Sequence, residues 1–314
     1  MTFLKYIKIT LLLSSLFFLK ENSFAISDDH LKISVDKTFK ALYNFEFQKA
    51  DSLIQKIKSN YNSHPITHLL VTSYYWWLIV SGEDNPDNRK NYEKGIDNAL
   101  SILNTKDKNQ LSNEDIGNYI NVYAYIARME LFNKELISGF VHLNNCIGYL
   151  KKSFEKENEY EMFYLTSGLY NYFVAHSSKE YPYLLPYLAF HPKGNREKGT
   201  LQLFTAYKSK DALIKTEATY FLMKIFYERE KDYAKAEMFA EKLTDKYPDN
   251  LIYQYYYYTI LFARDKKEEA ILQITKLNAS AASNTQLSRS QKNYFIEMTQ
   301  EDIKNYLLKH TKEN

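Results

Sequence analysis

The sequence is poor in the residues that usually interrupt secondary structure, with only 8 Gly and 6 Pro among 314 residues. A many-stranded β-sandwich or barrel needs a turn every ~8–12 residues, so this scarcity argues against an all-β fold. A single cysteine, Cys146, excludes an internal disulfide. The formal net charge of +3, from 41 basic and 38 acidic residues, gives no electrostatic footprint for nucleic acid.

Motifs for catalysis and metal binding are also missing. The chain contains no G-x-S-x-G, H-E-x-x-H or C-x-x-C segment and no glycine-rich phosphate loop. Two close pairs, His64 with His68 and His142 with Cys146, lack the further ligands or orienting group that a metal site or a nucleophile needs. We therefore expect buried or helix-capping side chains there, and predict no catalytic residue, no metal and no cofactor.

Large aromatic side chains are abundant, with 29 Tyr and 19 Phe. The proportions of 45% hydrophobic and 25% charged residues are those of an ordinary globular chain. Few breaks combined with many large side chains indicate long helices that pack on one another. The composition therefore predicts an all-α fold.

Residues 1–25 have the organisation of a secretory signal peptide. Two lysines precede an apolar run of 11 residues at 9–19, and Ser23 and Ala25 supply small residues before a cut after residue 25. The apolar run is shorter than the ~20 residues that cross a bilayer. We expect this segment to be removed and the mature chain to be periplasmic, associated with the cell envelope or secreted. An uncleaved anchor is the alternative.

The most apolar later segment, residues 66–82, contains His68, Thr72 and Ser73. A helix that is apolar on all sides is more often buried between neighbouring helices than placed in a membrane. We therefore predict no transmembrane helix in the mature chain.

Residues 217–250 contain a unit of two helices. Large and small side chains recur three and four positions apart, which places each set on one helix face. These side chains are Tyr220, Met223, Tyr227, Ala236, Ala240 and Leu243, and Pro248 ends the unit. In its size pattern the 34-residue window resembles the tetratricopeptide repeat, although Tyr220, Lys224 and Leu243 stand where that family has Trp, Gly and Ala.

The same pattern recurs at residues 251–284 and 30–65, where Ala270 and Ala50 occupy the small position at which two helices cross. Three further hairpins are predicted from residues 66–81 with 89–103, 114–131 with 135–154, and 160–176 with 196–207. The resemblance implies one repeat domain at 26–290, a right-handed α-solenoid of about six hairpins, with a capping helix and tail at 291–314.

The resemblance also implies that the first helix of each hairpin lines a concave binding surface. The matching positions are Phe221, Ile225, Tyr255 and Thr259, with Glu228, Arg229 and Phe262 at the rim. One subclass of the family holds a peptide's terminal carboxylate with Lys and Asn at the first four positions, and this chain has neither there. The expected surface is therefore rich in tyrosine, which suits protein interfaces. The alternative is that these tyrosines replace Leu and Phe in core packing.

Residues 177–195 separate the two helices of the hairpin predicted from residues 160–176 and 196–207. The segment contains three prolines, yet it is too apolar for a solvated loop. Its large apolar side chains include Tyr183, Leu184, Tyr187 and Phe190. Two interpretations remain open: a plug that fills a gap in the superhelix, or a contact with a partner or a membrane surface.

The leading hypothesis is a non-catalytic protein–protein interaction scaffold of the cell envelope, with protein partners and no nucleic acid. The first alternative is a glycan-binding module that uses aromatic platforms. The second is a hydrolase built on helical hairpins, for which no motif is present.

Overall fold

The computed structural model describes residues 28–180 and 191–310, and every regular element among them is a helix. The predicted all-α class is therefore confirmed for this part of the chain. The predicted signal peptide and the four apolar residues of the proline-rich segment, Tyr183, Leu184, Tyr187 and Phe190, lie outside the described residues.

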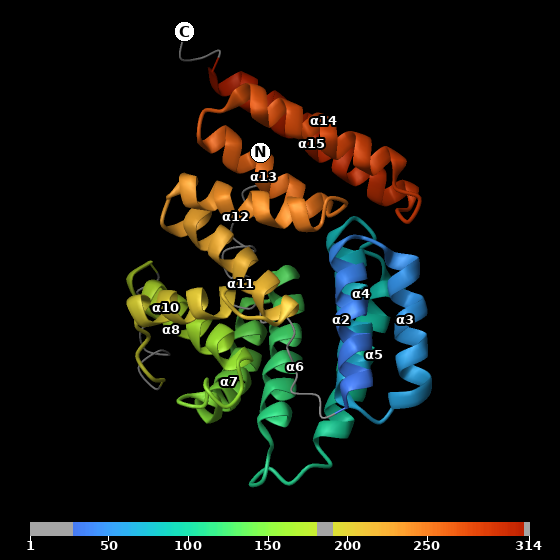
Figure 1. The fold of residues 1–314 in the computed structure, drawn as a ribbon, viewed down its shortest axis with the longest axis vertical. Coiled ribbons are helices and arrows are strands. Elements are labelled where there is room, and N and C mark those ends of the chain that lie inside the picture. Colours follow the sequence, from blue (N-terminus) through green and yellow to red (C-terminus); the bar gives the residue numbers. More distant parts are fainter. Residues whose placement is uncertain (1–27, 181–190, 311–314) are drawn as a thin grey trace.

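The helices form consecutive hairpins whose two members pack on each other (Figure 1). The pairs are α2 (Asp29–Tyr43) with α3 (Phe47–Tyr61), α4 (Pro65–Val80) with α5 (Pro86–Leu103), α6 (Asn113–Phe132) with α7 (Leu136–Ser153), α8 (Met162–Glu180) with α10 (Arg196–Tyr207), α11 (Ala212–Lys224) with α12 (Tyr233–Lys246), and α13 (Leu251–Ala263) with α14 (Lys267–Ser283). A π-helical turn, η2 (Ile225–Arg229), extends α11, and α15 (Arg289–His310) follows α14. Each pair corresponds to a hairpin predicted from the sequence, and the packing of neighbours is consistent with a helical repeat.

The turns inside these hairpins repeat one backbone geometry. Phe45, Lys134, Lys231 and Asp265 have φ values of 55°, 68°, 56° and 58°, and each stands two residues before the second helix of its hairpin. At Phe45 the amide donates to Leu42 O at 3.1 Å and the next amide to Ala41 O at 2.9 Å, and the same bonds recur at Lys134 and Asp265. This is the Schellman arrangement, which ends a helix through a left-handed residue. Its recurrence shows that several hairpins share one turn.

Small residues stand where paired helices approach closely. Ala50, Ala236 and Ala270, predicted at helix crossings, are all fully buried. Between α4 and α5 the approach is tighter, because a Cβ on Gly95 would lie 2.3 Å from Thr72 Oγ1 and 2.9 Å from His68 O. Side chains larger than these would push the hairpins apart.

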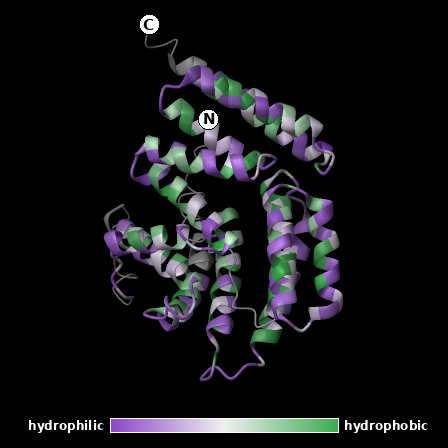
Figure 2. Cartoon of the chain, in the orientation of Figure 1, coloured by the Kyte–Doolittle hydropathy of each residue, from purple (hydrophilic) through white to green (hydrophobic). Residues whose placement is uncertain are grey.

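Hydrophilic and hydrophobic residues alternate along the helices, as expected when each helix buries one stripe (Figure 2). Helix α6 begins with a capping box at Ser112, in which the Asp115 amide donates to Ser112 Oγ at 3.0 Å and the Ser112 amide donates to Asp115 Oδ2 at 3.2 Å.

The first two hairpins also contact the last helices of the chain, which the sequence did not predict. The Asn250 side-chain amide donates to Tyr43 O at 2.7 Å, and the Gln291 side-chain amide donates to Ser81 Oγ at 2.6 Å. The rings of Phe45 and Phe295 lie 6.2 Å apart. Figure 1 shows α2 and α4 beside the C-terminal helices. Helix α15 therefore packs on α14 and joins it to the N-terminal hairpins.

Candidate functional site

The first helices of successive hairpins lie against one another on the inner side of the fold. Contacts join α2 to α4, α4 to α6, α8 to α11, and α11 back to α2. Helix α11 is thus enclosed by helices from both halves of the chain. This inner side is where the sequence placed the candidate partner surface.

Two of the predicted partner-binding residues offer no surface in this structure. Phe221 is fully buried and Ile225 is 2% exposed. The physical reason is that α11 packs against α12, α10, α8 and α2 at once. The interpretation of these positions as open groove positions is therefore corrected, since side chains buried this deeply act as core.

The predicted rim residues Glu228 and Arg229 lie in the π-helical turn and are half-buried. The carboxylate of Glu228 lies 3.4 Å from Lys224 Nζ, one turn earlier, whose side chain is 1% exposed. Burial lowers the pKa of Lys224, and the charge of Glu228 opposes that shift. Single π-helical turns are rare and often occur at functional sites.

Tyr255, Thr259 and Phe262 share one face of α13, and this face is directed toward α15. Tyr255 and Tyr258 have ring centroids 5.4 Å apart, and the Tyr258 hydroxyl donates to Asp302 Oδ2 of α15 at 2.9 Å. Phe262 stacks on Tyr306 at 4.3 Å. All three predicted residues are half-buried, and Phe262 contacts the C-terminal helix directly.

Arg128 is the functional candidate that the sequence pattern did not reveal. It is fully buried on α6, and its guanidinium carbon lies 4.9 Å from the Trp76 ring centroid and 4.8 Å from that of Tyr125. Such cation–π contacts strengthen when water is excluded. The available signal was a basic residue inside an otherwise apolar helical run, and Lys224 shows the same signal.

Charged side chains from separate helices converge around Lys224. We call them the inner charged cluster: Arg128, Glu217, Lys224, Glu228 and Arg229. The charges of Arg128 and Arg229 act on Lys224, and those of Arg128, Glu217 and Glu228 act on Tyr220.

Tyrosine rings border this cluster. Lys224 Nζ lies 5.8 Å from the Tyr220 ring centroid and 5.5 Å from that of Tyr256, and the Tyr43 hydroxyl donates to the Glu217 carboxylate. The arrangement brings cations, carboxylates and aromatic rings together in the interior, with Glu228 and Arg229 as its half-buried members.

The two histidine pairs noted in the sequence have structural partners. His64 Nδ1 accepts from the Ile66 amide at 3.2 Å and caps α4, as expected, and its Nε2 lies 3.1 Å from Glu114. His142 Nε2 lies 3.3 Å from Glu130, and burial raises the pKa of the Cys146 thiol. Within residues 28–180 and 191–310, no group of three or more His, Cys, Asp or Glu is placed to hold a metal ion.

None of the described helices combines the length and apolar character needed to cross a membrane. Comparison with protein-family models, curated proteins and solved structures gave no match.

Proposed function

We propose that this protein is an exported, non-catalytic interaction scaffold of the cell envelope, built as a tetratricopeptide-like right-handed solenoid that binds a protein partner. The observation that carries this proposal is the half-buried face formed by Arg229, Tyr255 and Thr259, which the buried charges of the inner charged cluster support from behind. The recurrent Schellman turns and the buried alanines at helix crossings support the repeat architecture. The signal-peptide pattern of residues 1–25 supports export.

The energetic cost of the inner charged cluster favours recognition over a purely structural role. Burying an ion costs several kcal/mol even after relaxation, and apolar residues of similar volume are often as stabilising. Arg128 and Lys224 are 0% and 1% exposed, so two cations are desolvated in the same region of the fold. Strongly perturbed buried charges gather at functional sites more often than elsewhere.

A partner would gain access at the half-buried edge of the cluster and at the residues next to it. Arg229, Tyr255 and Thr259 retain partial exposure, whereas Phe221 and Ile225 do not. We therefore assign the contact to the π-helical turn and the adjoining face of α13. Tyr and Arg are the residues most often found at the energetic centres of interfaces.

Site-specific photocrosslinking in the intact envelope tests this assignment. A crosslinking amino acid in place of Tyr255 should capture one defined protein, and the same amino acid in place of Lys276, exposed on α14, should not. The capture should be lost when Arg229→Glu is added. Equal capture from both positions, or none from Tyr255, would contradict the proposal.

One observation favours the alternative of a glycan-binding module. Tyr119 and Tyr149 stack with ring centroids 4.2 Å apart, and Tyr123 continues the stack 5.8 Å from Tyr149. Tyr123 and Tyr149 are half-buried, and Lys152 Nζ lies 5.7 Å from the Tyr149 centroid. Calorimetric titration with oligosaccharides, compared with Tyr149→Ala, tests it. A flat titration of the unaltered protein would remove this alternative.

A further inference from the structure

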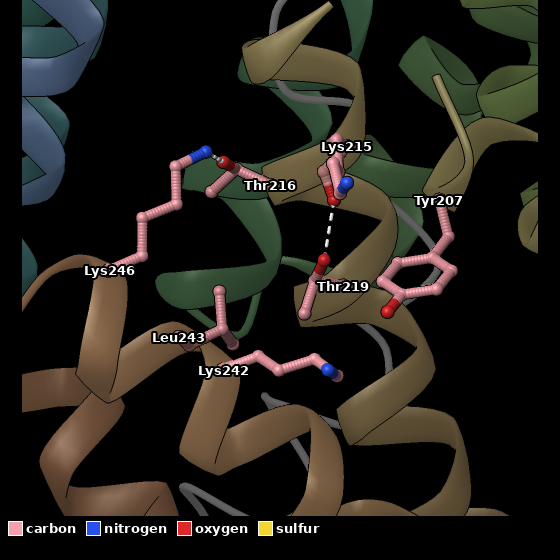
Figure 3. Close-up of a pocket in the computed structure, with 7 residues that line it drawn as sticks. All are labelled: Tyr207, Lys215, Thr216, Thr219, Lys242, Leu243 and Lys246. Atoms are coloured by element: carbon pink, nitrogen blue, oxygen red, sulfur yellow. Dashed lines mark hydrogen bonds between the residues drawn. The ribbon is translucent and has the colours of Figure 1, made fainter. Parts of the chain in front are cut away.

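A pocket separate from the inner charged cluster lies between α11 and α12, beside the end of α10 (Figure 3). Its volume is about 220 Å³. The lining residues are Tyr207, Lys215, Thr216, Thr219, Lys242, Leu243 and Lys246. Three of these seven carry a positive charge, and none carries a negative charge.

The charge of Asp211 offsets the positive charge of this pocket only in part. No described Asp or Glu forms an ion pair with Lys215, Lys242 or Lys246. Burial, followed by the charges of Lys215 and Lys40, lowers the pKa of Lys246, and Asp211 opposes the shift. Ammonium groups that repel one another in a recess would be stabilised by a bound anion.

The hydrogen bonds at the pocket leave the lysine ammonium groups as its main donors, with the Thr219 oxygen as an acceptor. Lys246 Nζ is held by Thr216 Oγ1 at 2.9 Å and Ala212 O at 3.4 Å. The Thr219 hydroxyl donates to Lys215 O at 2.6 Å, so its proton is already committed. The groups left to bind a ligand are the ammonium protons and the Tyr207 hydroxyl, which Figure 3 shows beside Lys215 and Lys242.

We propose that this pocket binds a phosphate dianion, either as free phosphate or as a phosphomonoester. Three cations lining one pocket match a doubly charged group with several acceptor oxygens better than a single carboxylate. A volume of 220 Å³ equals about seven water molecules at ~30 Å³ each, which leaves space for a substituent on the phosphate. The substituent belongs to a small metabolite or to a lipid headgroup.

Calorimetric titration of the purified protein with inorganic phosphate and with glycerol 3-phosphate tests the site. Flotation with vesicles of phosphatidylcholine, with and without phosphatidic acid, tests the lipid source. We expect saturable binding with one site per chain. The double variant Lys215→Gln/Lys246→Gln should weaken it at least ~10-fold, because each charge-assisted hydrogen bond contributes strongly. Lys276→Gln on α14 is the matched control and should leave binding unchanged.

A second variant guards against misfolding of the first. Lys242 is exposed, and within the described residues its side chain forms no ion pair that Lys242→Gln would remove. This variant should therefore fold normally and still weaken binding several-fold. Binding of the soluble phosphates alone identifies a metabolite site, and preference for phosphatidic acid vesicles identifies a headgroup site. Absence of saturable binding to every probe would overturn the proposal. So would equal binding by all variants, or equal affinity for chloride.

Discussion

The contact between the first hairpin and the C-terminal helix can be tested by replacing Phe45 with Ala. Phe45 is fully buried, and its ring lies 5.2 Å from Phe47, 5.7 Å from Trp77 and 6.2 Å from Phe295 of α15. Removing a buried Phe ring costs about 3–5 kcal/mol in the free energy of unfolding. The backbone at this position is left-handed, with φ of 55°, and stays strained in the Ala variant. Relief of backbone strain therefore does not offset the loss of side-chain packing.

Hydrogen exchange shows where the stability is lost. If α15 depends on the first hairpin, amides of residues 289–310 should exchange faster in Phe45→Ala, together with those of α2 and α3. Ile57→Ala is the matched control, because Ile57 is 3% exposed near the end of α3 and its truncation costs about 2–5 kcal/mol. Ile57→Ala should loosen the first hairpin and leave residues 289–310 less affected.

Hydrogen exchange can also refute the dependence of α15 on the first hairpin. In an open repeat array, each hairpin depends mainly on its sequence neighbours. Unchanged exchange at residues 289–310 in Phe45→Ala, with the expected loss in α2 and α3, would show that the two ends of the fold are independent.

Three further predictions concern single positions. Lys231→Gly should raise the free energy of unfolding by about 0.5–1 kcal/mol in a urea titration, because Lys231 is exposed and has a φ of 56°; a destabilised variant would contradict this. Gly95→Ala should lower the free energy of unfolding by about 1–3 kcal/mol, because its Cβ would meet Thr72 Oγ1 at 2.3 Å. Gly148→Ala, whose Cβ would meet no atom within 4 Å, should raise it by up to about 1 kcal/mol. Changes of the same sign in the two variants would refute this account of the packing. Burial and the charge of Asp211 raise the pKa of Asp36 to about 6, so the folded state holds a proton that the unfolded chain releases. The free energy of unfolding should therefore fall as the pH rises from about 4 to 6. In urea titrations, Asp36→Asn should flatten that pH dependence and raise the free energy of unfolding by about 1 kcal/mol at neutral pH.

Much of the local structure could be read from the sequence. The hairpins predicted at 30–65, 217–250 and 251–284 correspond to α2–α3, α11–α12 and α13–α14 within a few residues. The 3.6-residue period, the caps and the scarcity of Gly and Pro act within one helix or one turn, so they need no knowledge of distant contacts. The recurrent turn was less predictable from the sequence. Its left-handed position holds Phe, Lys or Asp, whereas the usual sequence signal for such a turn is glycine.

The candidate partner-binding residues stay a prediction, and the structure shows only how far each of them is buried. Glu228, Arg229, Tyr255, Thr259 and Phe262 keep partial exposure, in line with a surface along the π-helical turn and α13. The burial of Phe221 and Ile225 depends on which other helices enclose α11, and that cannot be derived from the spacing of residues along α11 itself.

The sequence by itself determined the helices, their pairing into hairpins and the small residues at their crossings, because neighbours along the chain supply these interactions. Only the tertiary structure decided that the first hairpins meet the last ones. The Tyr43 hydroxyl reaches Glu217 across 174 positions and the Asn250 amide reaches Tyr43 O across 207. Such contacts join residues far apart in the sequence, so no pattern within one helix or one hairpin can predict them.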